Sequence, residues 1–381
     1  MRTNWKRCLL ITASVSCLGF AVQIGSGVAA SSEEPGKYKY DASWPKPLPN
    51  NWALGGITGM FVDQDDHIWV LNRPRDLNQT NNYATLNPAP AECCIAAPAV
   101  LEFDVEGNLL RSWGKPDMVA GWPKSEHTIF VDKQHNVYIA GAQPGDTLLK
   151  FTEDGKFVSD FGHRGPAVPT EGQKQDNQQT DLLLRGVAAA TLDENAHEIY
   201  VADGYLNRRV MVFDWDTGKF KRGWGAYGKS LSEIDNNPQP PHDPKVVAKD
   251  FKSPVHCVRI AKDGLVYVCD RAGDRVQVFD KQGKYIKEFF VANTTLRNGA
   301  AGSIDFSPDP GQKYIFIADI MNNVVWELER DTGKIVNKIG RTGHAGGEFT
   351  LAHVATMDSK GNLYTGEVGP GPRVQKFAPV P

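Results

Sequence analysis

The sequence repeats one pattern along most of its length: an apolar segment, a turn, a second apolar segment that ends near Asp, and two further apolar segments. The copies begin with TGMFVD, HTIFVD, RGVAAA, HCVRIA, GSIDFS and HVATMD, at Thr58, His127, Arg185, His256, Gly302 and His353. Apolar and polar residues that alternate between Gly-, Asp- and Asn-containing turns predict antiparallel β-strands. Such repeats bury their faces only by stacking on one another. We therefore predict an all-β protein, a six-bladed β-propeller with four strands in each blade.

The last copy is one strand short, because HVATMD, NLYTGE and RVQKF lead directly to the end of the chain. An unpaired strand would leave an open sheet edge. The segment Tyr38–Trp44 precedes the first copy, so we predict that this N-terminal strand completes the last blade. A second irregularity is the segment Pro74–Pro98, which is rich in Asn, Pro and Ala. It interrupts the first blade after its second strand, and insertions in repeat proteins often gather on the binding face.

The N-terminus predicts export from the cell. It combines a basic start, an uncharged apolar stretch and small residues at a cleavage point, in Arg2, Lys6, Arg7, residues 8–24 and residues 28–30. These are the features of a secretory signal peptide. We assign residues 1–30 to the signal and residues 31–381 to the propeller, and expect a periplasmic or secreted protein with no membrane attachment after cleavage. The formal net charge of −3 predicts no nucleic-acid partner.

Four cysteines lie beyond the predicted signal, at Cys93, Cys94, Cys257 and Cys269. An even number in an exported chain permits disulfides. Cys257 and Cys269 lie on the two strands of one predicted hairpin, roughly opposite each other, which predicts a cross-strand disulfide. Cys93 and Cys94 are adjacent in sequence, and a vicinal disulfide and a reduced pair remain as alternatives.

The first position of the repeat carries histidine in every second copy, at His127, His256 and His353. In a ring of six blades these three side chains would be evenly spaced around one axis. Three imidazoles with open coordination positions are a typical zinc site, and other first-row metals also accept imidazole. The alternative is three unrelated channel histidines bonded to water or backbone. Their alternation favours a metal site.

A second position closes the second strand of each copy and reads Asn72, Gly141, Asp203, Asp270, Asp319 and Glu367. The next residue is Arg73 in the first copy and Arg271 in the fourth, which would face each other across the ring. Two guanidiniums at the channel mouth could hold a carboxylate, although local ion pairs are the alternative. Tyr205 follows Asp203 and Gly204 in the third copy, between two histidine blades. It is a candidate general base, or else a packing tyrosine.

These residues carry a resemblance to a known family. The chain resembles NHL-repeat six-bladed propellers and, more narrowly, the catalytic core of peptidyl-α-hydroxyglycine α-amidating lyase, also called peptidylamidoglycolate lyase. The matching stretches run from about Trp44 to Phe377 and are GGITGMFVD…VLNR, SEHTIFVD, YVADGYLNRRVMVF, SPVHCVRI…VCDRAGDRVQVF and LAHVATMD.

The resemblance implies a function for the matching residues. In that family three histidines hold a catalytic zinc, and a tyrosine and two arginines line the substrate site. Carried over, His127, His256 and His353 would bind Zn²⁺, and Tyr205, Arg73 and Arg271 would be catalytic. The implied reaction cleaves an N–C bond at an α-hydroxylated carbon of a small-molecule or peptide-derived carboxylate. The family's Asp after the last histidine, which helps hold a structural calcium, is Val354 here, and that departure counts against calcium.

A rival from another class is a non-catalytic NHL-repeat propeller that binds a protein or small ligand through its loop face. Fold alone does not separate the two. A stoichiometric transition metal would, because a binding scaffold has no need for one. The sequence leaves the physiological substrate and the oligomeric state open.

Overall fold

The computed structural model describes residues 38–77, 94–142, 148–161, 175–178 and 184–380. The chain divides into two units, Met1–Glu34 and Pro35–Pro381. The first unit, with the predicted signal peptide, lies outside the described residues. Every element below belongs to the second unit. Among the described residues, no helix combines the length and apolar character needed to span a bilayer.

The second unit contains six four-stranded antiparallel sheets. The innermost strands are β3 (Gly56–Val62), β8 (Ser125–Val131), β12 (Val187–Asp193), β16 (Val255–Ile260), β20 (Ser303–Phe306) and β24 (Ala352–Met357). The second strands are β4 (Ile68–Arg73), β9 (Val137–Ala142), β13 (Glu198–Asp203), β17 (Val266–Asp270), β21 (Tyr314–Asp319) and β25 (Leu363–Glu367). The third strands are β6 (Val100–Phe103), β10 (Leu148–Phe151), β14 (Arg209–Asp214), β18 (Arg275–Phe279), β22 (Val324–Glu329) and β26 (Val374–Pro379). The outer strands are β7 (Leu109–Trp113), β11 (Phe157–Phe161), β15 (Phe220–Trp224), β19 (Tyr285–Phe290), β23 (Ile335–Ile339) and β1 (Tyr38–Tyr40).

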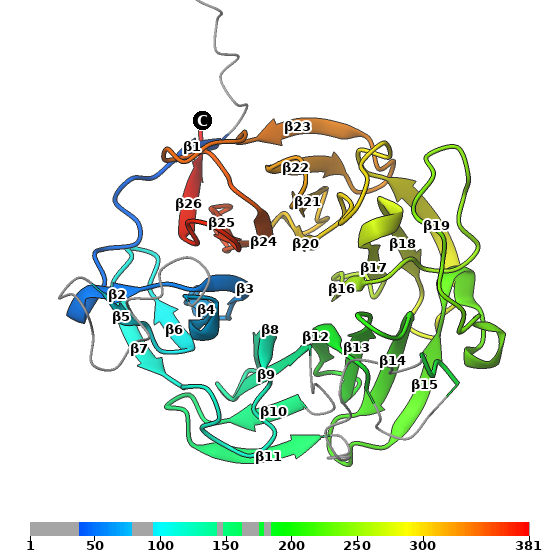
Figure 1. Cartoon of the computed structure of the whole chain (residues 1–381), viewed down its shortest axis with the longest axis horizontal. Helices are drawn as coiled ribbons and strands as arrows, with labels where there is room; N and C mark the ends of the chain where they lie inside the picture. The colour runs from blue at the N-terminus through cyan, green and yellow to red at the C-terminus, as the bar shows by residue number, and fades with distance from the viewer. Residues whose placement is uncertain (1–37, 78–93, 143–147, 162–174, 179–183, 381) are drawn as a thin grey trace, which may run out of the picture. The chain divides into compact units, whose positions relative to one another are not determined.

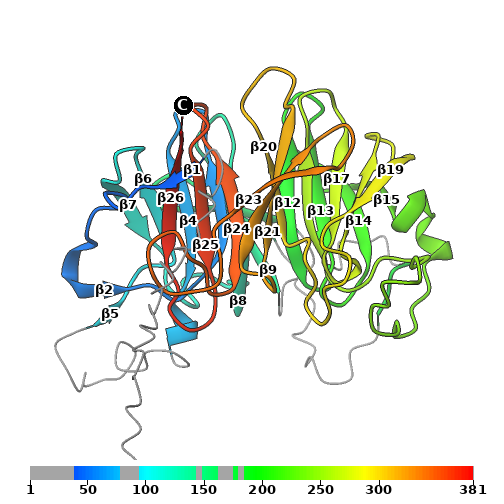
Figure 2. The same cartoon turned by 90° about the horizontal axis from the view of Figure 1, so that it is seen from above.

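The six sheets form a closed ring, and the predicted fold class is confirmed. Each inner strand contacts the inner strands of both neighbouring blades, so that β3, β8, β12, β16, β20 and β24 follow one another around the axis (Figure 1). Figure 2 shows the ring from the side, with the connections between strands at its two faces. Large apolar clusters fill the spaces between blades; one joins Val276 of the fourth blade to Leu328 of the fifth. Burial between blades is therefore what holds the repeats together.

The Asp at the end of the first strand in several repeats has a structural role. Asp132 accepts hydrogen bonds from the N–H of Asn136 at 2.8 Å and from the Tyr138 hydroxyl at 3.1 Å. Asp358 makes the same bonds in the last blade, with Asn362 at 2.8 Å and Tyr364 at 3.1 Å. The carboxylate thus closes the turn and satisfies a buried phenol, which explains the recurring pattern Asp-x-x-x-Asn-x-Tyr.

The last blade takes its outer strand from the start of the described chain. β1 pairs antiparallel with β26, with Tyr38 opposite Pro379 and Tyr40 opposite Phe377. Trp44, a few residues later, packs its ring against both the first and the last blade, at 5.6 Å from the Phe103 ring and 4.9 Å from the Tyr364 ring. N- and C-terminal segments therefore meet in one sheet.

The remaining elements are short. β2 (Trp52–Ala53) pairs in parallel with β5 (Ile95–Ala96). Single 3₁₀ turns occupy connections, at η1 (Pro49–Asn51), η2 (Pro74–Asp76), η4 (Ala226–Gly228), η5 (Leu231–Glu233) and η6 (Arg271–Gly273). In the first blade β4 ends at Arg73 and β6 begins at Val100. Most of the intervening segment, including Cys93, lies outside the described residues. Cys94, which is described, is disulfide-bonded.

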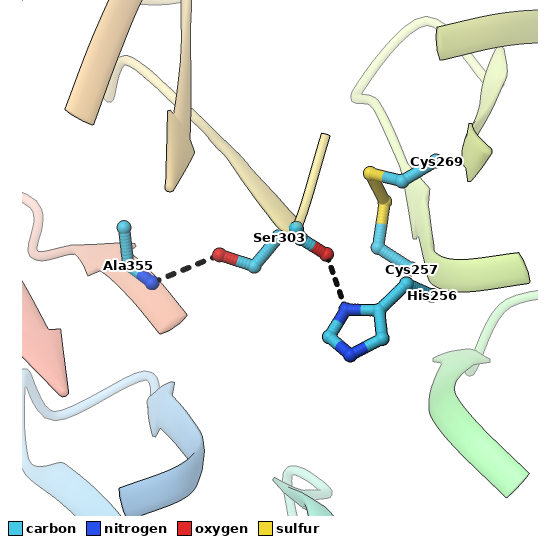
Figure 3. The surroundings of a disulfide bond; sticks show 6 residues. His256, Cys257, Cys269, Ser303 and Ala355 are labelled. Atoms are coloured by element: carbon cyan, nitrogen blue, oxygen red, sulfur yellow. Dashed lines mark hydrogen bonds between the residues drawn. A yellow bond between two sulfur atoms is a disulfide. The ribbon is translucent and has the colours of Figure 1, made fainter. Parts of the chain in front are cut away.

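The predicted cross-strand disulfide is confirmed. Cys257 in β16 and Cys269 in β17 are direct partners in the sheet register and form a disulfide, with Cα atoms 4.8 Å apart. The bond lies beside His256, the residue that precedes Cys257 in the chain (Figure 3).

Candidate metal centre

A shift in strand pairing distinguishes the first position of the repeat. In five inner strands the pairing with the second strand shifts by one residue, and the skipped residues are Thr58, His127, Ala188, His256 and His353. A bulge of this kind redirects a side chain. In the fifth blade Gly302 takes the equivalent place just before β20, and its N–H donates to the Ala318 carbonyl at 3.0 Å.

The prediction that Arg185 occupies this position in the third blade is wrong. The bulged residue there is Ala188, and Arg185 lies three residues earlier, where its N–H donates to Asp203 Oδ1 at 2.6 Å. Gly55 occupies the corresponding place in the first blade, donating to Asn72 Oδ1 at 2.6 Å. The sequence Gly-Val-Ala-Ala-Ala carries no side chain that marks the register, so only backbone pairing reveals it. The alternation of histidines is unchanged.

The three histidines converge on the ring axis. Their ring centroids form a nearly equilateral triangle, with His127–His256 at 4.9 Å, His127–His353 at 4.9 Å and His256–His353 at 5.0 Å. One ring nitrogen from each lies within 4.8 Å of the others. All three are buried and line a cavity of about 70 Å³, which has room for several water molecules.

Backbone carbonyls of neighbouring blades orient the imidazoles. His127 Nδ1 donates to the Ala188 carbonyl at 2.7 Å, and His256 Nδ1 donates to the Gly302 carbonyl at 2.6 Å (Figure 3). Both acceptors are the first-position residues of the next blade. A carbonyl only accepts, so the proton is on Nδ1 and the lone pair of Nε2 faces the axis. This is the arrangement that fixes the tautomer of metal-binding histidines.

The electrostatics keep the imidazoles neutral. Burial, reinforced by the Arg73 guanidinium, lowers the pKa of His127 from 6.5 to about 3. Burial and then the Arg271 guanidinium hold the pKa of His256 well below its usual value. Burial and the neighbouring His127 do the same to the pKa of His353. Three neutral imidazoles bind a cation without first losing protons.

The phenol of Tyr205 reaches the point where the histidines converge. Its oxygen lies 2.7 Å from His127 Nε2 and 3.1 Å from His256 Nε2. Because both Nε2 atoms are acceptors, the phenol donates to one of them at a time. Tyr205 is held on its loop by Ser253, whose hydroxyl donates to the Tyr205 carbonyl at 2.9 Å. Gly204 has no room for a Cβ, which would clash with the Val255 carbonyl.

The two arginines flank the triad but are held differently. Arg73 donates through Nε and Nη2 to the Glu126 carbonyl, at 3.2 and 3.0 Å, and through Nη1 to Asp76 at 3.3 Å. Arg271 donates through Nε to the Asn298 carbonyl at 2.9 Å, and its guanidinium carbon lies 5.9 Å from the centre of the Tyr205 ring. Both guanidiniums act on the histidine pKa values, so the structure brings all six predicted site residues together.

No sequence pattern indicated the groups that position the arginines. Two are backbone carbonyls, of Glu126 and Asn298, which no side-chain pattern can signal. The third, Asp76, lies three residues beyond Arg73, and its spacing within a short turn was the available clue. Its carboxylate sits where Gly56 has no side chain, since a Cβ there would approach Asp76 Oδ2 to 2.5 Å.

The donor set fits zinc and not calcium. Three neutral imidazoles, of which His127 and His256 have Nδ1 bonded to a carbonyl, match a zinc site with a free position. Calcium needs six to eight oxygen ligands. The described residues lining the axial cavity include no Asp or Glu, and position 354 is a buried valine. Metal binding itself stays a prediction.

Sequence comparison finds relatives among NHL repeat-containing proteins and amidating enzymes. NHL repeat-containing protein 3 of Homo sapiens is 25% identical over 294 residues, covering 74% of this chain and 73% of that protein. Peptidyl-glycine alpha-amidating monooxygenase A of Xenopus laevis is 22% identical over 361 residues, covering 89% of this chain and 33% of its own length. The chain is a six-bladed propeller that is similar in sequence to an NHL repeat-containing protein and to the amidating enzymes. It spans about a third of the Xenopus protein.

Two further comparisons bear on family and fold. A probable peptidyl-alpha-hydroxyglycine alpha-amidating lyase of Caenorhabditis elegans is 24% identical over 230 residues, covering 59% of this chain and 56% of that protein. A solved structure of streptogramin B lyase superposes with a TM-score of 0.53 at 11% identity, covering 90% of this chain and 98% of the other. At that identity the likeness concerns the fold alone. No family model matches the sequence.

Proposed function

We propose that this protein is an exported zinc-dependent lyase that cleaves the N–C bond at an α-hydroxylated carbon. The observation that carries the proposal is one axial site that combines three neutral imidazoles, a phenol within hydrogen-bond distance of two of their Nε2 atoms, and two flanking guanidiniums. The Caenorhabditis relative, a probable peptidyl-alpha-hydroxyglycine alpha-amidating lyase, supports the same reaction class. The Cys257–Cys269 disulfide supports an oxidising compartment such as the periplasm or the cell exterior.

The proposed substrate is an N-acyl α-hydroxyglycine, either a small molecule or the end of a peptide. Zinc held by His127, His256 and His353 would supply Lewis acidity toward the substrate hydroxyl. In its phenolate form Tyr205 takes the proton from that hydroxyl as the hydroxyl oxygen becomes a carbonyl oxygen and the C–N bond breaks. The resulting phenol returns the proton to the departing nitrogen, so the products are an amide and glyoxylate. Arg73 and Arg271 hold the carboxylate.

The metal is tested by elemental analysis of purified protein. Wild type is expected to carry one zinc, and His256→Ala to lose most of it. His197→Ala is the matched control, because the His197 side chain is 58% exposed and outside the site, so its zinc content should equal that of wild type. Full zinc retention by His256→Ala would remove the shared site.

The reaction is tested with a short N-acyl α-hydroxyglycine and glyoxylate release as the readout. Tyr205→Phe keeps the ring and removes the phenol oxygen, so kcat should fall roughly 100-fold or more, as for a lost general base. Arg271→Ala should mainly raise KM, if the carboxylate is held equally in ground and transition states. Both variants should keep their zinc. An equally fast Tyr205→Phe would take the base role from Tyr205.

The rival function is a non-catalytic propeller that binds a protein or small ligand. It is distinguished by the same two measurements. Zinc-loaded wild type that releases no glyoxylate would reject the amidating-lyase reaction and leave the metal site with another substrate. Absence of any stoichiometric transition metal would favour the binding protein.

A further inference from the structure

Arg259 places a guanidinium in the axial cavity. It lies on β16, three residues beyond His256, which is about 10 Å along an extended strand. It lines the same axial cavity as the histidines. Its guanidinium carbon lies 5.7 Å from the centre of the Phe61 ring. Phe61 belongs to β3 of the first blade, which is opposite the fourth blade in the ring (Figure 1), so the contact passes across the axis.

The guanidinium is anchored by a buried carboxylate of the fifth blade. Arg259 Nη2 lies 2.7 Å from Asp305 Oδ1 on β20, and the Asp305 side chain is 10% exposed. The other carboxylate oxygen accepts from the Thr356 hydroxyl at 2.7 Å and from the Met357 N–H at 3.0 Å, both on β24. Through these contacts the first, fourth, fifth and sixth blades are joined at the axis.

The residues around the Arg259 guanidinium do not suit a divalent cation. The residues at the axis do not fit the structural calcium that the resemblance to the amidating lyase implies, since Val354 replaces its carboxylate. Asp305, which follows the cavity-lining Ile304, is already paired with Arg259. A cation entering this part of the cavity would meet the guanidinium charge and an apolar wall that includes Ile304 and Val258. Both features oppose its binding.

We infer that Arg259 is the internal axial cation of this propeller, and that Arg259, Asp305, Thr356 and Phe61 form a lock that replaces structural calcium in holding the ring closed. The four residues are called the axial lock below. The inference concerns ring stability and does not rest on the proposed lyase reaction. It assigns a function to the one charged residue in the sequence His-Cys-Val-Arg-Ile.

The axial lock is tested by thermal unfolding of zinc-loaded protein. Calcium chloride at 5 mM, which exceeds the dissociation constants of ordinary protein calcium sites, should leave the Tm of wild type unchanged within about 1 °C. Arg259→Met should lower the Tm by roughly 5 °C or more, because it leaves the Asp305 charge buried and unpaired. Arg259→Met with Asp305→Asn should recover part of that loss. Thr356→Val, a milder change, should lower the Tm by a smaller amount.

An ion pair with an exposed carboxylate provides the control. Arg330 and Asp263 also join neighbouring blades, but the Asp263 side chain is 42% exposed, so Arg330→Met and Asp263→Asn should show little coupling. A calcium-induced rise of several degrees in wild type would overturn the inference. So would strictly additive effects of Arg259→Met and Asp305→Asn. If Arg259→Met does not fold, the calcium test and the Asp305→Asn and Thr356→Val variants still decide, because unchanged Tm values in both variants would refute the lock.

Discussion

Trp44 offers the sharpest test of ring closure, because it precedes the first blade yet is almost fully buried, at 2% exposure. Its ring contacts Phe103 of the first blade and Tyr364 of the last, and its Nε1 donates to the Asp104 carbonyl at 3.1 Å. Trp44→Ala removes both ring contacts and leaves a cavity, a change that costs about 3–5 kcal/mol in protein cores. That is a large share of the 5–15 kcal/mol typical of a folded protein.

The expected loss should appear as a lower urea midpoint and a Tm reduced by roughly 8 °C, at about 2 °C per kcal/mol for a unit of this size. Trp44→Phe keeps a ring between the blades and loses mainly the hydrogen bond, so it should cost about 1 kcal/mol. Both measurements use zinc-supplemented buffer for all proteins, so that a difference in metal content does not itself change stability.

Trp113 is the matched control, because it plays the same part between the first and second blades. Its ring lies 5.1 Å from Phe151, and its Nε1 donates to the Glu153 carbonyl at 2.9 Å. Trp113 is partly buried, so Trp113→Ala should also be destabilising, but less so than Trp44→Ala. If Trp113→Ala destabilises while Trp44→Ala changes the free energy of unfolding by less than about 1 kcal/mol, the N-terminal segment does not close the ring in solution.

Two further predictions concern the fourth blade. Replacing Cys257 and Cys269 together by Ser should lower the free energy of unfolding by about 3 kcal/mol, because the disulfide closes a loop with a sequence separation of 12; urea unfolding measures this, and a loss below about 1 kcal/mol would contradict it. Burial raises the pKa of the Asp274 carboxyl from 3.8 to about 7, so the folded state binds its proton more tightly and stability should fall as pH rises through that window. The free energy of unfolding should change by at most about 1.4 kcal/mol per pH unit. Asp274→Asn should flatten this dependence when urea unfolding is measured between pH 4 and 8. An identical dependence in both proteins would assign it to other groups.

The sequence determined the blade architecture because its signals are local. Strand alternation, Asp-closed turns and the missing strand of the last repeat depend on neighbouring residues. The opposition of Cys257 and Cys269 followed from counting along one hairpin, and so did the place of Arg73 and Arg271 at the ends of equivalent second strands. Histidine in every second repeat then sufficed to place three imidazoles around one axis.

Only the tertiary structure decided how these residues act together. The shift in strand pairing that redirects His127, His256 and His353 leaves no mark on the sequence, and for that reason Arg185 was assigned in place of Ala188. The carbonyls that orient the imidazoles and the arginines are backbone atoms of other blades. Arg259 and Asp305 meet only because the ring closes. Contacts between blades depend on the three-dimensional register of whole sheets, which no local pattern encodes.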